Sequence, residues 1–152
     1  LWRADHAVGP VTYGSNRCSN GMVVDGNDVS MYGLAVEHTE KDLTVWNGED
    51  GATYFYQSEL PYDVNQQQYS NYNGYRVSAM VEQHKAYGLG VYCFFRDHSV
   101  TVQSGIVAPS HLEPNFVHPL TVFLTGNGAI LHVLNDKGNP STRPGTPSYW
   151  CQ

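Results

Sequence analysis

Charged residues of either sign are scarce in this sequence, and basic residues are the scarcest. Asp, Glu, Lys and Arg make up 14% of the 152 residues, against about 25% in an ordinary soluble domain. Only 8 residues are Lys or Arg, and the formal net charge is −6. Since nucleic acids are held mainly by basic contacts to phosphates, we expect no nucleic-acid partner.

Long hydrophobic runs and helical periodicity are also missing. The longest apolar stretch, residues 87–95, contains two Gly and is too short to cross a bilayer, so we expect no membrane partner. Only residues 78–87 offer a candidate helical turn. The His and Cys residues show no metal-ligand spacing, and no dinucleotide, P-loop or nucleophile-elbow motif occurs. The sequence therefore predicts no metal and no cofactor.

Residues typical of strands and turns are abundant instead. The chain contains 11 Tyr and 15 Gly, and short β-branched and aromatic runs are bounded by Gly, Asn and Asp, which favours an all-β fold. We predict strands at 21–24, 29–36, 43–46, 52–57, 75–81, 88–95, 100–107, 120–124 and 130–135. The domain is expected to span 1–135, followed by a Pro- and Gly-rich tail at 136–152.

Turn and strand signals recur along the first half of the chain. Turn residues stand at 25–26, 47–48 and 73–74, and strands are centred near Tyr32 and Tyr54. A spacing in the low twenties is typical of one coil of a parallel β-helix. An antiparallel sandwich remains the alternative from periodicity alone. The polar segment 60–74 interrupts the rhythm, as functional or covering loops do.

The chain ends and the cysteines suggest a partner. The sequence opens LWRADH without Met or signal-peptide pattern, which predicts a cleaved precursor or part of a larger protein. Of three cysteines, Cys93 lies in an apolar run and is expected to be a buried free thiol. Cys18 and Cys151 either pair with each other or with cysteines outside this chain. Few Lys and many Tyr and Asn favour a secreted, extracellular protein.

Two acidic residues stand at equivalent points of the rhythm. Glu37 ends an apolar run and Glu59 ends an aromatic run. If one coil takes about 22 residues, the two side chains lie on adjacent strands about 4.8 Å apart. Two carboxylates this close do not both ionise cheaply, and a retained proton is what a general acid needs. The alternative is that both are surface charges on separate strand ends.

Aromatic residues surround these acids in the sequence, namely Trp46, Tyr54, Tyr56, Tyr62 and Tyr92. Tyr and Trp combine an apolar face with a polar tip, which suits stacking on sugar rings. The alternative is that they are ordinary core residues.

Four segments occur in an order that resembles a known family. They read LWRADH at 1–6, VSMYGLAVEH at 29–38, YQSELPY at 56–62 and AYGLGVYCFF at 86–95. Together they resemble the C-terminal portion of glycoside hydrolase family 55 and its pectate-lyase-like relatives. The resemblance implies the last coils of a right-handed parallel β-helix in a secreted β-1,3-glucanase.

The resemblance also implies roles for individual residues. Glu59 matches the general acid of an inverting reaction on a β-glucan, and Glu37 supports it. Gln57, Tyr62 and His38 match positions around these acids and are expected to bind the substrate. The aromatic character of Trp46 and Tyr92, and not the resemblance, adds them to the expected substrate-binding residues. The group that positions the attacking water is expected in a preceding part of the protein, against which this chain packs, unless another chain takes that place.

Two further interpretations remain open at this stage. A non-catalytic extracellular β-helix, structural or carbohydrate-binding, has the same composition. A small lectin-like sandwich would instead require the chain to fold alone.

Overall fold

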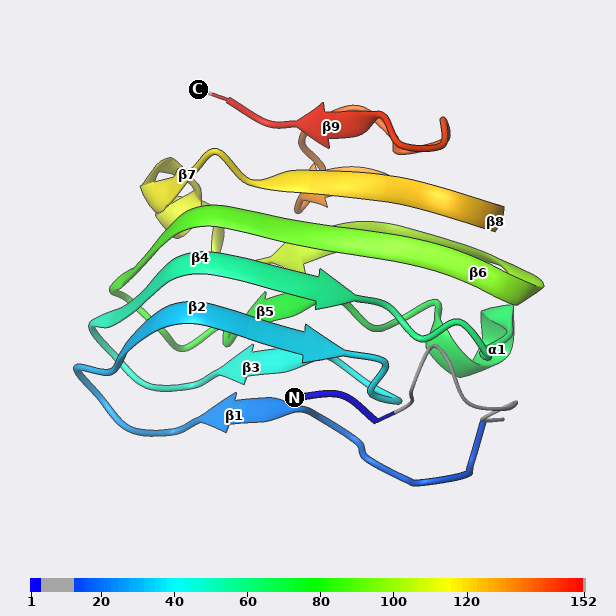
Figure 1. The fold of residues 1–152 in the computed structure, drawn as a ribbon. Helices are drawn as coiled ribbons and strands as arrows, with labels where there is room; N and C mark the ends of the chain where they lie inside the picture. Colours follow the sequence, from blue (N-terminus) through cyan, green and yellow to red (C-terminus); the bar gives the residue numbers. More distant parts are fainter. Residues whose placement is uncertain (4–12, 152) are drawn as a thin grey trace.

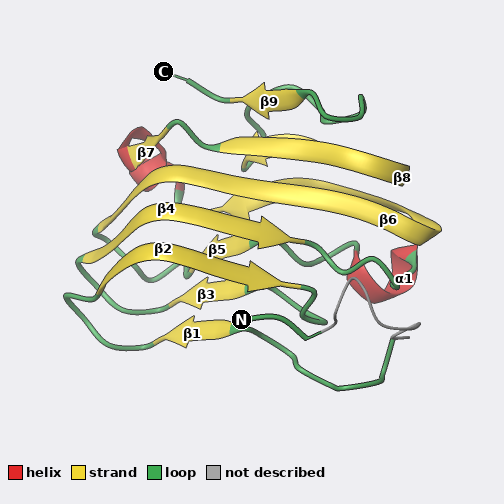
Figure 2. Ribbon diagram, viewed as in Figure 1, coloured by secondary structure: helices red, strands yellow, loops and turns green. Residues whose placement is uncertain are grey.

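The computed structural model describes residues 1–3 and 13–151 (Figures 1 and 2). Residues 4–6 of the LWRADH segment lie outside the described residues. The structure consists mostly of strands, with one four-residue helix and one 3-10 helix. The elements are β1 (Met22–Val24), β2 (Ser30–Glu37), β3 (Thr44–Trp46), β4 (Gly51–Glu59), α1 (Gln66–Tyr69), β5 (Tyr75–Val77), β6 (His84–Val107), η1 (Ser110–Asn115), β7 (Phe116–Val117), β8 (Leu120–Leu134) and β9 (Pro147–Tyr149).

The strands pair in two parallel series, between which the chain alternates. The first series contains β1, β3, β5 and the end of β6. The second contains β2, β4 and the first part of β6, and β8 then pairs with both parts of β6. Among the strands of the described residues, β9 alone pairs antiparallel, along β8, so the sheet is mixed. Figure 1 shows β2, β4 and β6 side by side, with β1, β3 and β5 behind them. An antiparallel sandwich is therefore wrong for the described strands.

The interval of 22 residues holds for the first pairs of strands. Met22 pairs with Thr44 and Ser30 with Ala52 across this interval, and Asn47 donates to Asp25 over the same separation in 2.7 Å. The interval then lengthens, because the segment 60–74 is inserted after β4. Our alignment of 73–74 with the turns at 25–26 and 47–48 is consequently wrong. Asn73 instead lies beside Asp42, and the backbone N–H of Asn73 donates a hydrogen bond to the side chain of Asp42.

Several element boundaries also differ from the prediction. The strand predicted at 75–81 ends at Val77, and residues 78–83 form one hydrogen-bonded turn, in which the Val81 N–H donates to the Ser78 carbonyl in 3.1 Å, but no helix. The only α-helix of the described residues, α1, lies in the inserted segment instead. Asn65 caps this helix, because its side chain accepts a hydrogen bond from the backbone N–H of Gln68. The polar composition of the segment gave no sign of so short a helix. No helix in the described part of the chain is long and apolar enough to cross a membrane.

The core lies between the two series of strands. Its largest fully buried side chains include Trp46, Tyr56, Tyr75, Leu89 and Ile106. The buried phenols are satisfied by hydrogen bonds: Tyr56 donates to the carbonyl of Gly74 in 2.7 Å. Cys93 is fully buried and free, as predicted, and burial raises the pKa of its thiol to about 12. Cys18 and Cys151 are free as well, so they do not pair with each other.

Candidate active site

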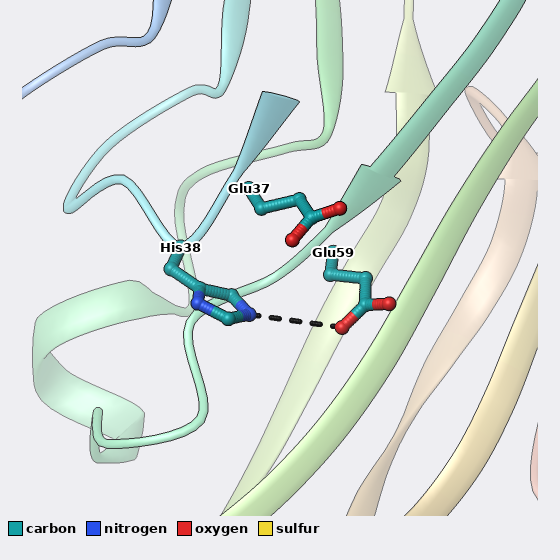
Figure 3. A group of neighbouring side chains, drawn as sticks. All are labelled: Glu37, His38 and Glu59. Atoms are coloured by element: carbon teal, nitrogen blue, oxygen red, sulfur yellow. Dashed lines mark ion pairs between the residues drawn. The ribbon is translucent and has the colours of Figure 1, made fainter. Parts of the chain in front are cut away.

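The ends of β2 and β4 bring Glu37 and Glu59 together. The parallel register places Glu37 directly opposite Glu59, as their spacing in the sequence predicts. Together with His38, they offer ligand atoms that all lie within 4.8 Å of one another. Figure 3 shows the two carboxylates beside each other, with the imidazole directed at Glu59. The two acids are therefore neighbours on adjacent strands and not charges on strands that lie apart.

A left-handed residue in each strand decides that these carboxylates face outward. Gly33, Phe55 and Gly88 have φ of +63°, +60° and +64° and stand at matching positions of β2, β4 and β6. Before this point Tyr32 is exposed, and after it Ala35 and Glu37 are the accessible side chains. The strand therefore shifts its alternation by one residue, and both acids share the outer face with the tyrosines upstream.

His38 lies directly beneath the carboxylate of Glu59. It follows the last residue of β2 with φ of +63°, and its backbone N–H donates to the carbonyl of Glu59 in 2.8 Å. Its imidazole is buried, and Nε2 lies 3.6 Å from Oε2 of Glu59, within ion-pair distance (Figure 3).

Tyr62 is the closest hydrogen-bond partner of Glu59. Its phenol donates to Oε2 of Glu59, and its ring packs against His38 at a centroid distance of 4.4 Å and against Phe94 at 4.8 Å. Burial raises the pKa of this phenol far above its usual range, and the hydrogen bond and the negative charge of Glu59 add to the effect. Tyr62 therefore remains a donor at all physiological pH values and fixes the orientation of the carboxylate.

Gln57 and Tyr92 border the same carboxylate. The amide of Gln57 lies 3.5 Å from Oε1 of Glu59, and Tyr92 is the register partner of Glu59 on β6. A Cβ at Gly90 would lie 2.9 Å from the ring of Tyr92. The ring therefore lies over Gly90, where any larger residue would displace it. Both residues predicted to bind substrate are thus part of the rim around Glu59.

Trp46 is the exception, and its prediction as a substrate-binding residue is wrong. Its side chain is completely buried, where it packs against Tyr75 and His84. Tyr56 likewise belongs to the core. The side chains of Trp46 and Tyr56 both point inward. Closeness to the acids along the sequence does not tell an inward-facing position from an outward-facing one. Tyr54 does face outward, but it lies near the middle of β4, on the upstream side of Phe55 and away from Glu59.

The sequence prediction missed an ion pair that frames the site. Arg3 contacts both carboxylate oxygens of Asp63 at 2.7 and 2.9 Å, and its Nε donates to the carbonyl of His38 in 2.6 Å. Both side chains are almost fully buried. Trp2, which is 68% exposed, pairs with Glu37 on the free edge of β2. Arg3 thereby joins the start of the chain to both segments that follow the acids.

The cluster of Glu37, His38 and Glu59 also has the size of a cation site. The hydrogen bond that Tyr62 donates to Oε2 of Glu59 is compatible with a carboxylic acid and with a metal ligand, since carboxylates that bind metals are themselves hydrogen-bonded.

Comparisons with known proteins identify relatives of this chain. Residues 1–59, which include both acids, match the family model of the LAM55 pectate lyase-like domain. An exo-beta-1,3-glucanase of Streptomyces sp. (strain SirexAA-E / ActE) is 38% identical over 149 residues, or 93% of this chain and 24% of the relative. The chain therefore resembles pectate-lyase-like proteins. The resemblance to the C-terminal part of glycoside hydrolase family 55 is confirmed.

Two solved structures of sacteLam55A from Streptomyces sp. SirexAA-E superpose on the chain with a TM-score of 0.90. One has 39% sequence identity and matches 99% of this chain and 29% of its own. The other, a variant in complex with glucose, has 38% identity and matches 99% of this chain and 28% of its own. The chain thus spans about a quarter of the length of the relatives it matches.

Proposed function

We propose that this chain is part of a glycoside hydrolase that cleaves a β-1,3-glucan, with Glu59 as the general acid. The observation that carries the proposal is the environment of Glu59. Tyr62 donates to one carboxylate oxygen, His38 lies at ion-pair distance, and Glu37 stands in register on the next strand. Such an arrangement orients a carboxyl group that gives its proton to a glycosidic oxygen.

Glu37 does not suit the role of water-activating base. In inverting glycosidases the acid and base lie about 6.5–9.5 Å apart so that a water fits between base and sugar. The ligand atoms of Glu37 and Glu59 are within 4.8 Å, which leaves no such room. We assign Glu37 to hydrogen bonds with the sugar and to the charge balance of Glu59. The water-positioning group then comes from a part of the protein outside this chain.

The parallel series of strands support a matching proposal for architecture. We infer that they are the coils of a right-handed parallel β-helix that packs against a further part of the same protein or another chain. A polysaccharide substrate implies a secreted, extracellular location. Of the remaining predicted substrate-binding residues, Gln57, Tyr62 and Tyr92 border Glu59 on the outer face, whereas His38 is buried and would act through its contact with Glu59.

The experiment that tests the proposal compares Glu59→Gln with Glu82→Gln in the full-length protein, by release of reducing sugar from laminarin. Glu82 is a matched control because its exposed side chain lies on a turn away from the site. We expect Glu59→Gln to lower turnover by roughly 100- to 10,000-fold, with unchanged folding. Glu82→Gln and addition of EDTA should change nothing. Wild-type turnover in Glu59→Gln, or loss with EDTA, contradicts the proposal.

A further inference from the structure

Phe55 occupies a backbone position that its neighbours give to glycine. The register pairs on either side of it place Gly33 of β2 and Gly88 of β6 beside it. All three residues have φ near +60°. In this left-handed region a side chain is unfavourable, and a bulky aromatic residue is a genuine outlier. Two of three equivalent positions thus have the residue that the backbone favours.

Packing within the described chain does not compensate for this strain. The side chain of Phe55 is 72% exposed. Tyr54, the residue before it, stacks between Tyr32 and Tyr87 at centroid distances of 4.8 and 5.2 Å. Within residues 1–3 and 13–151, the ring of Phe55 stacks on no other aromatic ring. Strained residues without internal compensation cluster at ligand sites.

The position of Phe55 relative to Glu59 indicates which ligand. Both side chains are on the outer face of β4, and four residues of strand correspond to about 13 Å. The flanking glycines leave both faces of the ring uncovered by neighbouring side chains. An accessible aromatic face beside a row of tyrosines suits the apolar face of a pyranose ring. A glucan chain with one end at Glu59 reaches Phe55 after a few sugar units.

We propose that Phe55 is a stacking platform for a distal sugar of the β-glucan chain, beyond the units held at Glu59. This inference rests on the proposed function and extends it to a second binding position. It also explains the strain, because a ring selected for binding is retained where Gly would stabilise the fold.

The test measures binding and stability separately in the full-length protein. Glu59→Gln serves as the background so that bound oligosaccharides are not cleaved. Calorimetric titration with laminaribiose and laminarihexaose compares this background with added Phe55→Gly, Phe55→Ala or Phe55→Trp. We expect Phe55→Gly and Phe55→Ala to weaken laminarihexaose binding roughly 3- to 10-fold. Laminaribiose binding should be unchanged, and Phe55→Trp should keep the affinity for both.

Thermal unfolding then separates binding from packing. Because Gly relieves the left-handed strain, Phe55→Gly should unfold at the same or a higher temperature than its parent, and above Phe55→Ala. A lower unfolding temperature for Phe55→Gly would mean that the ring packs against another part of the protein and would overturn the inference. Equal laminarihexaose affinity in Phe55→Gly and its parent overturns it while the proposed function stands. Absence of glucan binding and hydrolysis in the unmodified protein overturns both.

Discussion

The guanidinium of Arg3 forms two hydrogen bonds to the buried carboxylate of Asp63, at 2.7 and 2.9 Å. Asp63 directly follows Tyr62, and Arg3 also contacts the carbonyl of His38. The ion pair therefore fixes the backbone at His38 and next to Tyr62, the two residues whose side chains contact Glu59. A buried pair of this kind contributes little relative to an apolar pair of equal size, but removal of one partner leaves an uncompensated charge.

We predict that Asp63→Ala destabilises the protein by about 3–5 kcal/mol. Denaturation by urea measures the loss. Asp97→Ala is the matched control, because Arg96 and Asp97 form a similar two-point pair that is exposed. An exposed pair is worth about 0–1 kcal/mol. Equal effects of the two substitutions would contradict the structural role of Arg3 and Asp63.

Tyr62→Phe is predicted to lower kcat at least about tenfold. The substitution removes the hydroxyl that donates to Glu59 and keeps the ring that packs on His38 and Phe94. Steady-state kinetics on laminarin gives the result, with Tyr149→Phe as the control, because Tyr149 is exposed on β9. If Tyr62→Phe retained wild-type kcat, the phenol would not orient the acid.

The stereochemistry of the product distinguishes the two roles open to Glu37. We predict that the first sugar released from a β-1,3-glucan is the α-anomer, because the water arrives from a group outside this chain and inverts the centre. Proton NMR early in the reaction reads the anomer before mutarotation. Release of the β-anomer would instead identify Glu37 as a nucleophile, since retaining enzymes hold their carboxyl groups about 5–5.5 Å apart.

We predict that the folded protein loses stability in mild acid because of His84. Burial lowers the pKa of its imidazole from 6.5 to about 4, while Nε2 contacts the Tyr75 hydroxyl at 3.0 Å. The unfolded chain binds this proton below pH 6.5 and the folded chain does not. The contribution is therefore complete above pH 6.5 and falls by roughly 3 kcal/mol as the pH drops to about 4.

Urea denaturation between pH 4 and 7 measures this slope. His84→Gln removes the titrating group and should flatten the curve, whatever its effect at pH 7. His98→Gln is the control, because His98 is exposed on β6. An unchanged slope in His84→Gln would show that other groups, such as the carboxylates, account for the acid sensitivity.

The sequence by itself determined the pairing of the two acids. In parallel strands, equal spacing along the chain becomes direct opposition across the sheet, so the interval between Glu37 and Glu59 was sufficient. The same reasoning failed after Glu59, because an inserted segment changes the interval without a periodic signal. The sequence also predicted the buried thiol of Cys93, because the apolar run around it is visible in the local sequence.

Tertiary structure alone decided which side chains face the site. The left-handed residues at Gly33, Phe55 and Gly88 shift the alternation, and a Phe with positive φ cannot be recognised from composition. Trp46, on β3, was misplaced for a separate reason, since inward and outward positions differ by one residue of register. Arg3 and Asp63, 60 residues apart, meet only because successive strands stack. Long-range contacts of this kind follow from the path of the whole chain and not from any local pattern.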